Sequence, residues 1–348
     1  MIYSPFGGTS IINHQCSNMQ HTSNPALPFV LENYKGNPIS SNGRFYHPQY
    51  PFELGWTDVI KWKSKPNPYA EAKKNETWRP TVIQSDDFLK HNQDVFVWLG
   101  HASFFFRLNG KNILIDPVFG KLSFLMPRYS DFPVNPNKFN RLDYILLTHD
   151  HRDHCDISSL KLLANNNPQA QVICGLNMTP VIAHLFDEKN ITEMGWHQQY
   201  TDEKNDLKIT YMPTRHWCRR FLTDTNARLW GAYVFETKNK TIYFGGDSGY
   251  GDHFKSTAGL FPNIDYAFLG IGAFAPVWFM QSNHMSPSAA FKAYKDLGAK
   301  HFVPMHFGTF DLSDEPLGEP LRLLEGIHEE KGLNGEILFS KIGDATRV

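Results

Sequence analysis

The sequence predicts an α/β protein in which two mixed β-sheets pack face to face and helices cover their outer faces. Its 348 residues are 41% hydrophobic and 20% charged, a composition typical of globular proteins that bury a sizeable core. From residue 95 onward, short apolar runs alternate with segments of helical periodicity. Two successive runs of strands are each followed by helices, and this order favours two packed sheets.

The first run of elements combines short apolar strands with two helices. Asn109-Gly110 is a tight hairpin signal between two of these strands. Thr179 and Pro180 are typical of the N-cap and first turn of a helix. We expect strands at residues 95–98, 104–108, 112–115, 143–147 and 171–174, and helices at residues 157–164 and 179–186.

The second run repeats this alternation without repeating the sequence. Ser286 and Pro287 mark the start of one of its helices. We expect strands at residues 207–212, 229–236, 241–244, 266–271, 301–305 and 336–339, and helices at residues 252–260, 286–297 and 319–330.

Residues 1 to about 90 differ from the rest of the chain. They are rich in Pro, Asn, Ser and aromatic residues and show little periodicity, which predicts an irregular arm (1–90) wrapping a catalytic domain (91–348). The N-terminus lacks the basic and apolar regions of an export signal. The longest apolar run, at residues 268–280, is interrupted by Pro276. We expect a cytoplasmic protein, free or peripheral at a membrane, with an export signal already removed as the alternative.

Charge and cysteine content exclude some classes of function. The formal net charge is −1, which gives no general attraction to nucleic acid or anionic membranes. Four cysteines, with no C-x-x-C pair among them, indicate neither a disulfide framework nor a zinc knuckle. Cys155 and Cys218 stand beside histidines of interest, and packing is the role we expect for them.

The segment Thr148–Asp156 reads THDHRDHCD and holds the most informative motif, H-x-H-x-D-H. It directly follows the buried strand expected at 143–147. In extended geometry His149 and His151 point to the same side, while Asp153 and His154 follow where the chain turns. These are more ligands than one tetrahedral ion can take from so short a segment. We therefore expect two adjacent metal ions, although a histidine-rich surface loop is the alternative interpretation.

Three further candidate ligands follow predicted strands. His216 comes after the strand at 207–212, Asp247 lies in Gly245–Gly249 after the strand at 241–244, and His306 ends the strand at 301–305. Each alone would be interpreted as a structural residue. Because all should emerge at the same edge as the first motif, we expect them to complete the metal site. His101 and His284 border this edge, where each could contact substrate, move a proton or support a ligand.

Several longer motifs match one known family. The chain resembles the metallo-β-lactamase-fold hydrolases, and within them the group of phospholipases D that hydrolyse N-acylphosphatidylethanolamine. The H-x-H-x-D-H motif indicates only the superfamily, whereas the resemblance to the group extends from about Asn42 to about Phe310. It rests on WLGHAS (98–103), IDPVF (115–119), HWC (216–218), GGDSGY (245–250), GAFAPVWFM (272–280) followed by His284, and HFGTF (306–310).

The resemblance implies an αββα sandwich with the site at one edge of the two sheets. It also implies two zinc ions, one held by His149, His151 and His216 and the other by Asp153, His154 and His306, with Asp247 bridging. Two positions depart from the family: Ser248, where threonine is frequent, and Phe307, where tryptophan is frequent. These departures leave the ligands untouched and concern the substrate pocket.

A site of this kind predicts hydrolysis of a phosphodiester. Two such ions can lower the pKa of a shared water, and the resulting hydroxide would attack phosphorus. Asp153 and Asp247 would hold the hydroxide, and His284 is the candidate proton donor to the leaving alcohol. The apolar loops 124–129 and 274–280 would suit an acyl chain or a membrane interface, or else pack over the core.

The leading hypothesis is thus a zinc phosphodiesterase acting on a lipid such as N-acylphosphatidylethanolamine. The alternatives are a lactonase or other ester hydrolase with the same two-metal site, a nuclease, which the near-neutral charge disfavours, and a non-enzymatic metal-binding scaffold. Seven candidate ligands exceed the four that a closed structural site needs and favour catalysis.

Overall fold

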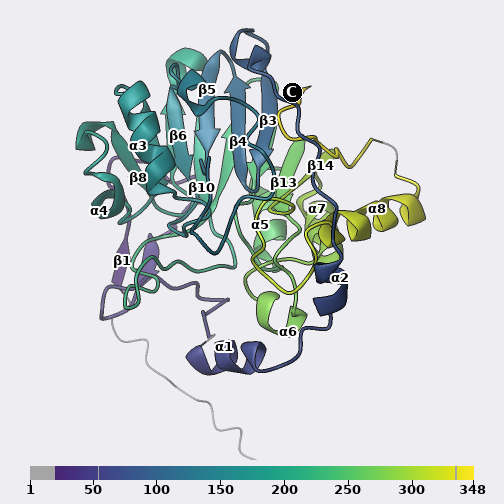
Figure 1. The fold of residues 1–348 in the computed structure, drawn as a ribbon. Helices are drawn as coiled ribbons and strands as arrows, with labels where there is room; N and C mark the ends of the chain where they lie inside the picture. The colour runs from purple at the N-terminus through teal and green to yellow at the C-terminus, as the bar shows by residue number, and fades with distance from the viewer. Residues whose placement is uncertain (1–19, 54, 334) are drawn as a thin grey trace, which may run out of the picture.

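The structure is a computed structural model that describes residues 20–53, 55–333 and 335–348. Two β-sheets face each other, and the longer helices lie on their outer faces (Figure 1). This confirms the α/β sandwich predicted from the sequence. Among the described residues, no helix is both long and apolar enough to cross a membrane. The expectation about an export signal concerns residues 1–19, which lie outside the described residues.

The first sheet has seven strands in the order β15-β3-β4-β5-β6-β7-β8. Neighbours from β15 to β5 are antiparallel and those from β5 to β8 are parallel. Asn109 and Gly110 join β4 to β5 with φ values of 48° and 76°, as a tight hairpin turn requires. The strands are β3 (Val95–Gly100), β4 (Ser103–Leu108), β5 (Lys111–Ile115), β6 (Tyr144–Leu147), β7 (Gln171–Gly175), β8 (Ile191–Met194) and β15 (Ala345–Arg347).

The second sheet has six strands in the order β14-β13-β12-β11-β10-β9. Here β9 to β12 are antiparallel neighbours, and β12, β13 and β14 run parallel. The strands are β9 (Gln199–Asp202), β10 (Leu207–Met212), β11 (Ala232–Glu236), β12 (Thr241–Phe244), β13 (Tyr266–Gly270) and β14 (His301–Met305).

Helices connect and cover the sheets. The side chain of Ser286 accepts a hydrogen bond from the backbone of Ala289 and caps α7, as the sequence predicts. The α-helices of this part are α3 (Ile157–Asn166), α4 (Thr179–Ile182), α5 (His253–Leu260), α6 (Val277–Met280), α7 (Pro287–Leu297) and α8 (Glu319–Lys331). Short 3-10 helices lie at Asp87–Leu89, Pro136–Lys138, Glu188–Asn190 and Glu203–Asn205.

The core shows why the strands bury both of their faces. Side chains alternate along a strand with period two, so Phe104 and Phe106 of β4 lie between the sheets, while Phe105 packs under α3. The rings of Phe104 and Phe106 each lie 5.1 Å from the ring of Phe268 on β13. Aromatic side chains on facing strands thus hold the two sheets together.

The N-terminal arm carries more regular structure than its sequence predicts. It contains β1 (Gln20–Thr22), β2 (Asn37–Ile39), α1 (Trp56–Lys63) and α2 (Ala70–Lys74). Phe45 is buried in the central core, and the amide of Ile83 donates to the carbonyl of Ile342. The arm also contacts both sheets, since Asn24 donates to the carbonyl of Glu193 on β8 and the carbonyl of Pro28 accepts from the amide of Gln199 on β9. A domain boundary near residue 90 stays a prediction.

Three other expectations about the elements were wrong. The strand expected at 336–339 is absent, because only Ile337 makes a bridge, to Phe302; the C-terminal β15 pairs with β3 instead. The helix expected at 179–186 ends at Ile182 and has Met178, not Thr179, at its N-cap. Strands β8 and β9 were not predicted, since both are short and mostly half-exposed.

Candidate metal centre

The predicted ligands emerge from strand ends and meet at one edge of the two sheets. The loop after β6 carries His149, His151, Asp153 and His154, and it is closed by hydrogen bonds from the amides of His154 and Cys155 to the carbonyl of His151. The other three residues follow strands of the second sheet: His216 follows β10, Asp247 follows β12 and His306 follows β14. The common edge expected from the sequence is therefore what the fold provides.

The first group of donor atoms comes from His149, His151, His216 and Asp247, whose ligand atoms all lie within 4.8 Å of one another. The Nδ1 of His151 lies 2.8 Å from Nε2 of His149 and 3.2 Å from Nε2 of His216. Three ring nitrogens converging in this way form one side of a tetrahedral cation site.

The second group comes from Asp153, His154, His306 and His101, again within 4.8 Å. Oδ2 of Asp153 lies 3.7 Å from Nε2 of His154 and 3.6 Å from Nε2 of His306. The sequence predicted three of these donors as ligands. His101 is an addition, because its Nε2 lies 3.0 Å from Oδ2 of Asp153.

Asp247 lies between the two groups. Its Oδ2 is 3.7 Å from Nε2 of His216 and 3.2 Å from Nε2 of His154, and its Oδ1 is 3.1 Å from Nε2 of His306. The side chain is only 2% exposed. One carboxylate thus faces both groups, as the bridging position predicted for it requires.

Several buried atoms of this cluster lie close to one another but make no hydrogen bond of acceptable geometry within the described part of the chain. They include Nε2 of His154, Nε2 of His306 and Oδ1 of Asp247. Buried polar atoms without partners destabilise a fold, and a divalent cation would satisfy all three. Histidine nitrogens and carboxylate oxygens are ligands that zinc accepts. The residues present therefore fit the metal that the family implies.

Hydrogen bonds behind the cluster fix which ring nitrogen faces it. Asp116, at the end of β5, accepts from Nδ1 of His154 at 2.7 Å and from the hydroxyl of Thr148 at 2.6 Å. The Thr148 hydroxyl therefore accepts from Nδ1 of His149, 3.0 Å away. Nδ1 of His216 donates to the carbonyl of Asn283 at 3.0 Å. In each of the three rings, Nε2 is left for a cation.

Asp116 was not identified as a site residue from the sequence. It is fully buried and accepts a third hydrogen bond, from the amide of Thr148 at 2.8 Å. The available signal was its place at a strand end, directly before Pro117. Three residues around the cluster also have left-handed backbone: His101 (φ 52°), Asp116 (φ 44°) and His306 (φ 62°). Non-glycine residues held in this conformation are concentrated at functional sites.

Burial and the two carboxylates divide the histidines into two kinds. Burial lowers the pKa of His149 and His216 well below the usual 6.5, so both rings are neutral at pH 7. Burial also acts against charge on His154 and His306, but the carboxylate of Asp247 overcomes it. The pKa of His154 lies well above 6.5 and that of His306 is raised to about 9.

The two central carboxylates stay ionised in spite of their burial. Neighbouring histidines, His154 first among them, hold the pKa of Asp153 and of Asp247 well below 3.8. The centre therefore keeps negative charge for a cation, and a metal ion bound there would displace protons from His154 and His306.

His284 lies at the rim of the cluster. Its Nδ1 is 3.8 Å from Oδ2 of Asp247, and its ring lies 5.4 Å from that of His216 and 5.3 Å from that of His306. Burial lowers the pKa of His284 to about 4, although Asp247 opposes the shift. His101 is buried beside Asp153 and is also neutral at pH 7, because burial lowers its pKa to about 3.

A cavity of about 490 Å³ extends from His284 towards the surface. Its walls combine side chains of the arm, of the segment after His216 and of α6. They include Phe52, Trp56, Trp217, Leu222, Phe279 and Met280. The segment 274–280 therefore borders the site, as expected, with Phe274, Phe279 and Met280 buried and Val277 and Trp278 exposed. Loop 124–129 does not line this cavity, although Phe124 and Leu125 are exposed.

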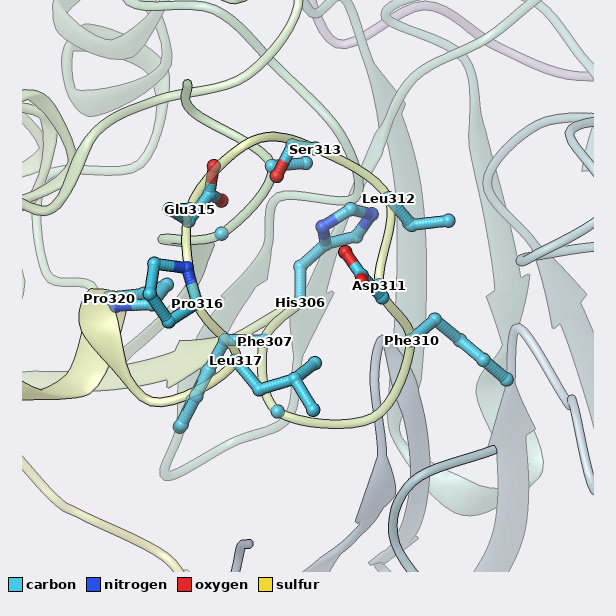
Figure 2. Close-up of a pocket in the computed structure, with 13 residues that line it drawn as sticks. His306, Phe307, Phe310, Asp311, Leu312, Ser313, Glu315, Pro316, Leu317 and Pro320 are labelled. Atoms are coloured by element: carbon cyan, nitrogen blue, oxygen red, sulfur yellow. The ribbon is translucent and has the colours of Figure 1, made fainter. Parts of the chain in front are cut away.

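The loop after His306 encloses a second, much smaller space (Figure 2). Its volume of about 20 Å³ has room for about one water molecule. Glu315 closes this loop by accepting hydrogen bonds from the amides of Phe274 and Ala275 at 3.0 and 2.9 Å. This space, which His306 helps to line, is too small for a substrate.

The cysteines of the described residues take no part in the cluster. Cys155, Cys174 and Cys218 are free and buried. Burial raises the pKa of each thiol, to about 12 for Cys155, so they are unreactive packing residues. Cys16 lies outside the described residues.

Comparison with known proteins agrees with this geometry. The family model of the β-lactamase superfamily domain matches residues 111–307. N-acyl-phosphatidylethanolamine-hydrolyzing phospholipase D 1 of Caenorhabditis elegans is 33% identical over 242 residues, which are 66% of this chain and 68% of the relative. The mitochondrial N-acyl-phosphatidylethanolamine-hydrolyzing phospholipase D of Saccharomyces cerevisiae is 30% identical over 278 residues, 76% of this chain but only 58% of the relative.

A solved structure shares the fold. Igni18, a metallo hydrolase from Ignicoccus hospitalis, superposes with a TM-score of 0.55 at 18% identity, covering 72% of this chain and 97% of Igni18. The family match covers more than half of the 348 residues and includes all seven predicted metal ligands. The chain therefore belongs to the β-lactamase superfamily of metal-dependent hydrolases.

Proposed function

We propose that this protein is a di-zinc phosphodiesterase that hydrolyses a phospholipid of the N-acylphosphatidylethanolamine type. The observation that carries the proposal is a pair of donor groups with Asp247 between them, beside His284 and an apolar cavity. A two-metal site suits a phosphodiester, and an apolar cavity beside it suits an acyl chain.

Each residue of the site has a role in this proposal. One zinc ion would be held by His149, His151 and His216, and the other by Asp153, His154 and His306. Asp247 would contact both ions. Zinc bound there would supply a Lewis acid and an activated water. Asp116 and Thr148 keep the imidazoles oriented through the hydrogen bonds described above.

His284 is proposed to deliver the proton to the leaving alcohol. It lies between the donor groups and the cavity, where the ester oxygen of a bound lipid would pass. Its ring is neutral at pH 7 because burial lowers its pKa to about 4. The negative charge of a bound phosphodiester acts to raise this pKa and the charge of the zinc ions acts to lower it, so the proposed role requires that the substrate outweigh the metal.

Arg219 is placed to attract the phosphate. Its guanidinium lies 5.1 Å from the ring of Trp217 and 5.3 Å from that of Trp56, and all three side chains line the cavity. No carboxylate among the described residues forms an ion pair with Arg219. An unpaired guanidinium beside a hydrolytic site favours an anionic substrate.

The surface around the cavity supports contact with a membrane. Six apolar side chains on α1, α6 and the segment after His216 are more than one-third exposed: Trp56, Ile60, Phe221, Leu222, Val277 and Trp278. The ammonium group of Lys61 lies 4.9 Å from the ring of Trp278, and α1 and α6 are neighbours (Figure 1). Apolar side chains edged by lysine are typical of surfaces that insert into anionic bilayers.

The two named relatives support the choice of substrate, since both are called phospholipases D that hydrolyse N-acylphosphatidylethanolamine. The test is product analysis after incubating zinc-loaded protein with N-acylphosphatidylethanolamine in mixed micelles. We expect phosphatidic acid and N-acylethanolamine, and loss of both in Asp153→Asn. Asp131→Asn, an exposed aspartate outside the cluster, is the matched control and should retain activity.

A negative result would redirect the proposal in a defined way. If the lipid is not cleaved but an activated phosphodiester is, the two-metal phosphodiesterase stands and the lipid substrate is wrong. If only lactones or carboxylic esters are hydrolysed, the ester-hydrolase alternative replaces it. If nothing is hydrolysed and zinc is bound, the protein is a metal-binding scaffold.

A further inference from the structure

A buried carboxylate stands inside the metal-binding motif without facing the metal centre. Asp150 lies between His149 and His151, and side chains alternate along an extended chain, so its carboxylate lies on the other side of the chain from both rings. It belongs to neither donor group, and its side chain is fully buried. A carboxylate buried in this way needs a partner of opposite charge.

Arg228 is the partner of Asp150. Its Nε donates to Oδ2 of Asp150 and its Nη2 donates to Oδ2 of Asp224, so one guanidinium joins two carboxylates. Oδ1 of Asp150 makes no hydrogen bond within the described part of the chain. The orientation of this buried carboxylate therefore depends on Arg228.

Arg220 holds the same loop at two points of its backbone. Its Nη1 donates to the carbonyl of Asp150 at 3.0 Å and to the carbonyl of Cys155 at 2.9 Å. These two carbonyls flank residues 151–154, which contribute to both donor groups. One guanidinium thus contacts the loop at both ends of this stretch.

Asp224 connects the two arginines. Its Oδ1 accepts hydrogen bonds from the amides of Arg220 at 3.1 Å and Phe221 at 2.7 Å, while its Oδ2 accepts from Arg228. Four residues therefore form a closed ring of contacts, which we call the arginine network: Asp150, Arg220, Asp224 and Arg228.

The arginine network joins the two segments that supply the first donor group. Asp150 belongs to the loop after β6, which carries His149 and His151, and the other three residues belong to the segment that begins at His216. None of the four residues lines the cavity at His284. The network therefore acts on the metal ligands and not on a substrate.

We propose that the arginine network consists of positioning residues for one of the two zinc ions, the ion that His149, His151 and His216 would hold. It fixes the residue between two of these ligands from the segment that begins at the third. The other ion depends on it less, because Asp116 orients His154. The proposal rests on the two-metal centre proposed above and does not depend on its substrate.

The test replaces Arg228 by Lys. Lysine keeps the positive charge, but its ammonium group cannot reproduce the planar fork that joins two carboxylates. Loss of a group that orients metal ligands lowers metal affinity by about 10–100-fold, and because Arg228 acts through Asp150 we expect about tenfold. Zinc affinity is measured by competition with a chelating indicator. Anomalous difference peaks from crystals equilibrated with limiting zinc show which ion is weakened.

Arg107→Lys is the matched control. Arg107 is also buried and donates through Nε and Nη1, to Asn112 and Phe88, but it lies at the end of β4 away from His101. This control should retain both zinc affinities, whatever it does to the unfolding temperature of the zinc-free protein. A purely structural role of Arg228 would likewise lower that temperature and leave the zinc affinities unchanged.

Unchanged zinc affinity in Arg228→Lys, or an equal loss at both zinc positions, would overturn the proposal. If Arg228→Lys does not fold, Asp150→Asn decides by the same criterion, because it keeps the shape of the side chain and removes the charge that Arg228 pairs with. Failure of the unmodified protein to bind two zinc ions would refute the two-metal centre itself.

Discussion

Replacing Asp116 by Asn separates the role of this residue from that of the metal ligands. The carboxylate accepts hydrogen bonds from Nδ1 of His154 at 2.7 Å, from the hydroxyl of Thr148 at 2.6 Å and from its amide at 2.8 Å. An asparagine of the same shape has one oxygen to accept and an NH₂ group that can only donate. At least one of the three donors therefore loses its acceptor, and Nδ1 of His154 loses its negatively charged acceptor whichever way the amide turns.

The expected effect is larger in one half of the metal centre, because Asp116 contacts His154 directly but reaches His149 only through the hydroxyl of Thr148. His154 belongs to the donor group with Asp153 and His306, whereas His151 and His216 make no contact with Asp116. Loss of a carboxylate that orients a ligating histidine lowers metal affinity by about 10–100-fold. We expect Asp116→Asn to weaken the zinc site of His154 by about that factor and the zinc site of His149 by less.

The assay is competition between the zinc-depleted protein and a chelating indicator, with unfolding temperature measured alongside. The control is Asp265→Asn, which also alters a buried carboxylate but one paired with Lys300 and remote from the cluster. That control should retain both affinities. If Asp116→Asn binds two zinc ions as tightly as the unmodified protein, or loses both equally, the assigned orientation of His154 is wrong.

Three further predictions concern turnover, membrane binding and stability. His284→Asn should lower the turnover number far more than the zinc content. An equal loss of both would show that His284 supports metal binding instead of donating a proton. Ile60→Asp and Trp278→Ala should each reduce co-sedimentation with anionic liposomes while hydrolysis of a soluble diester is unchanged, and the membrane surface is refuted if neither alters binding. The folded-state pKa values of His47 and His253, about 4 and about 3, lie below 6.5, so the stability that the neutral rings provide is complete above pH 6.5 and lost as pH falls towards 4. Each ring should lower the free energy of unfolding by ~1.4 kcal/mol per pH unit in that window, and urea titrations at pH 7, 6 and 5 should show a shallower decline in His47→Gln.

The sequence predicted the strands of the core well because their physical signal is local. Buried strands such as β6 and β13 consist of continuous apolar residues. The hairpin at Asn109-Gly110 and the cap at Ser286 depend only on adjacent residues. The short β15 has no such signal, because its place beside β3 depends on a pairing of residues about 250 positions apart in the chain.

The residues of the candidate site also differ in how local their signal in the sequence is. The ligands from the loop after β6 share one motif, and the other three follow strong strands, so their convergence followed from the fold class. Asp116 was not predicted, and His101 was placed only at the border of the site, because their roles depend on contacts made across the fold with His154 and Asp153. The cavity at His284 is lined by residues of the arm and by residues more than 150 positions further along the chain. No local sequence pattern predicts this contact.

The central claim is that two metal ions share Asp247. The most direct test is a crystal structure of the zinc-loaded protein, with anomalous data collected on both sides of the zinc absorption edge. We expect two zinc peaks, one among His149, His151 and His216 and one among Asp153, His154 and His306, with Asp247 between them. A single peak, or two peaks of which neither contacts Asp247, would contradict the account.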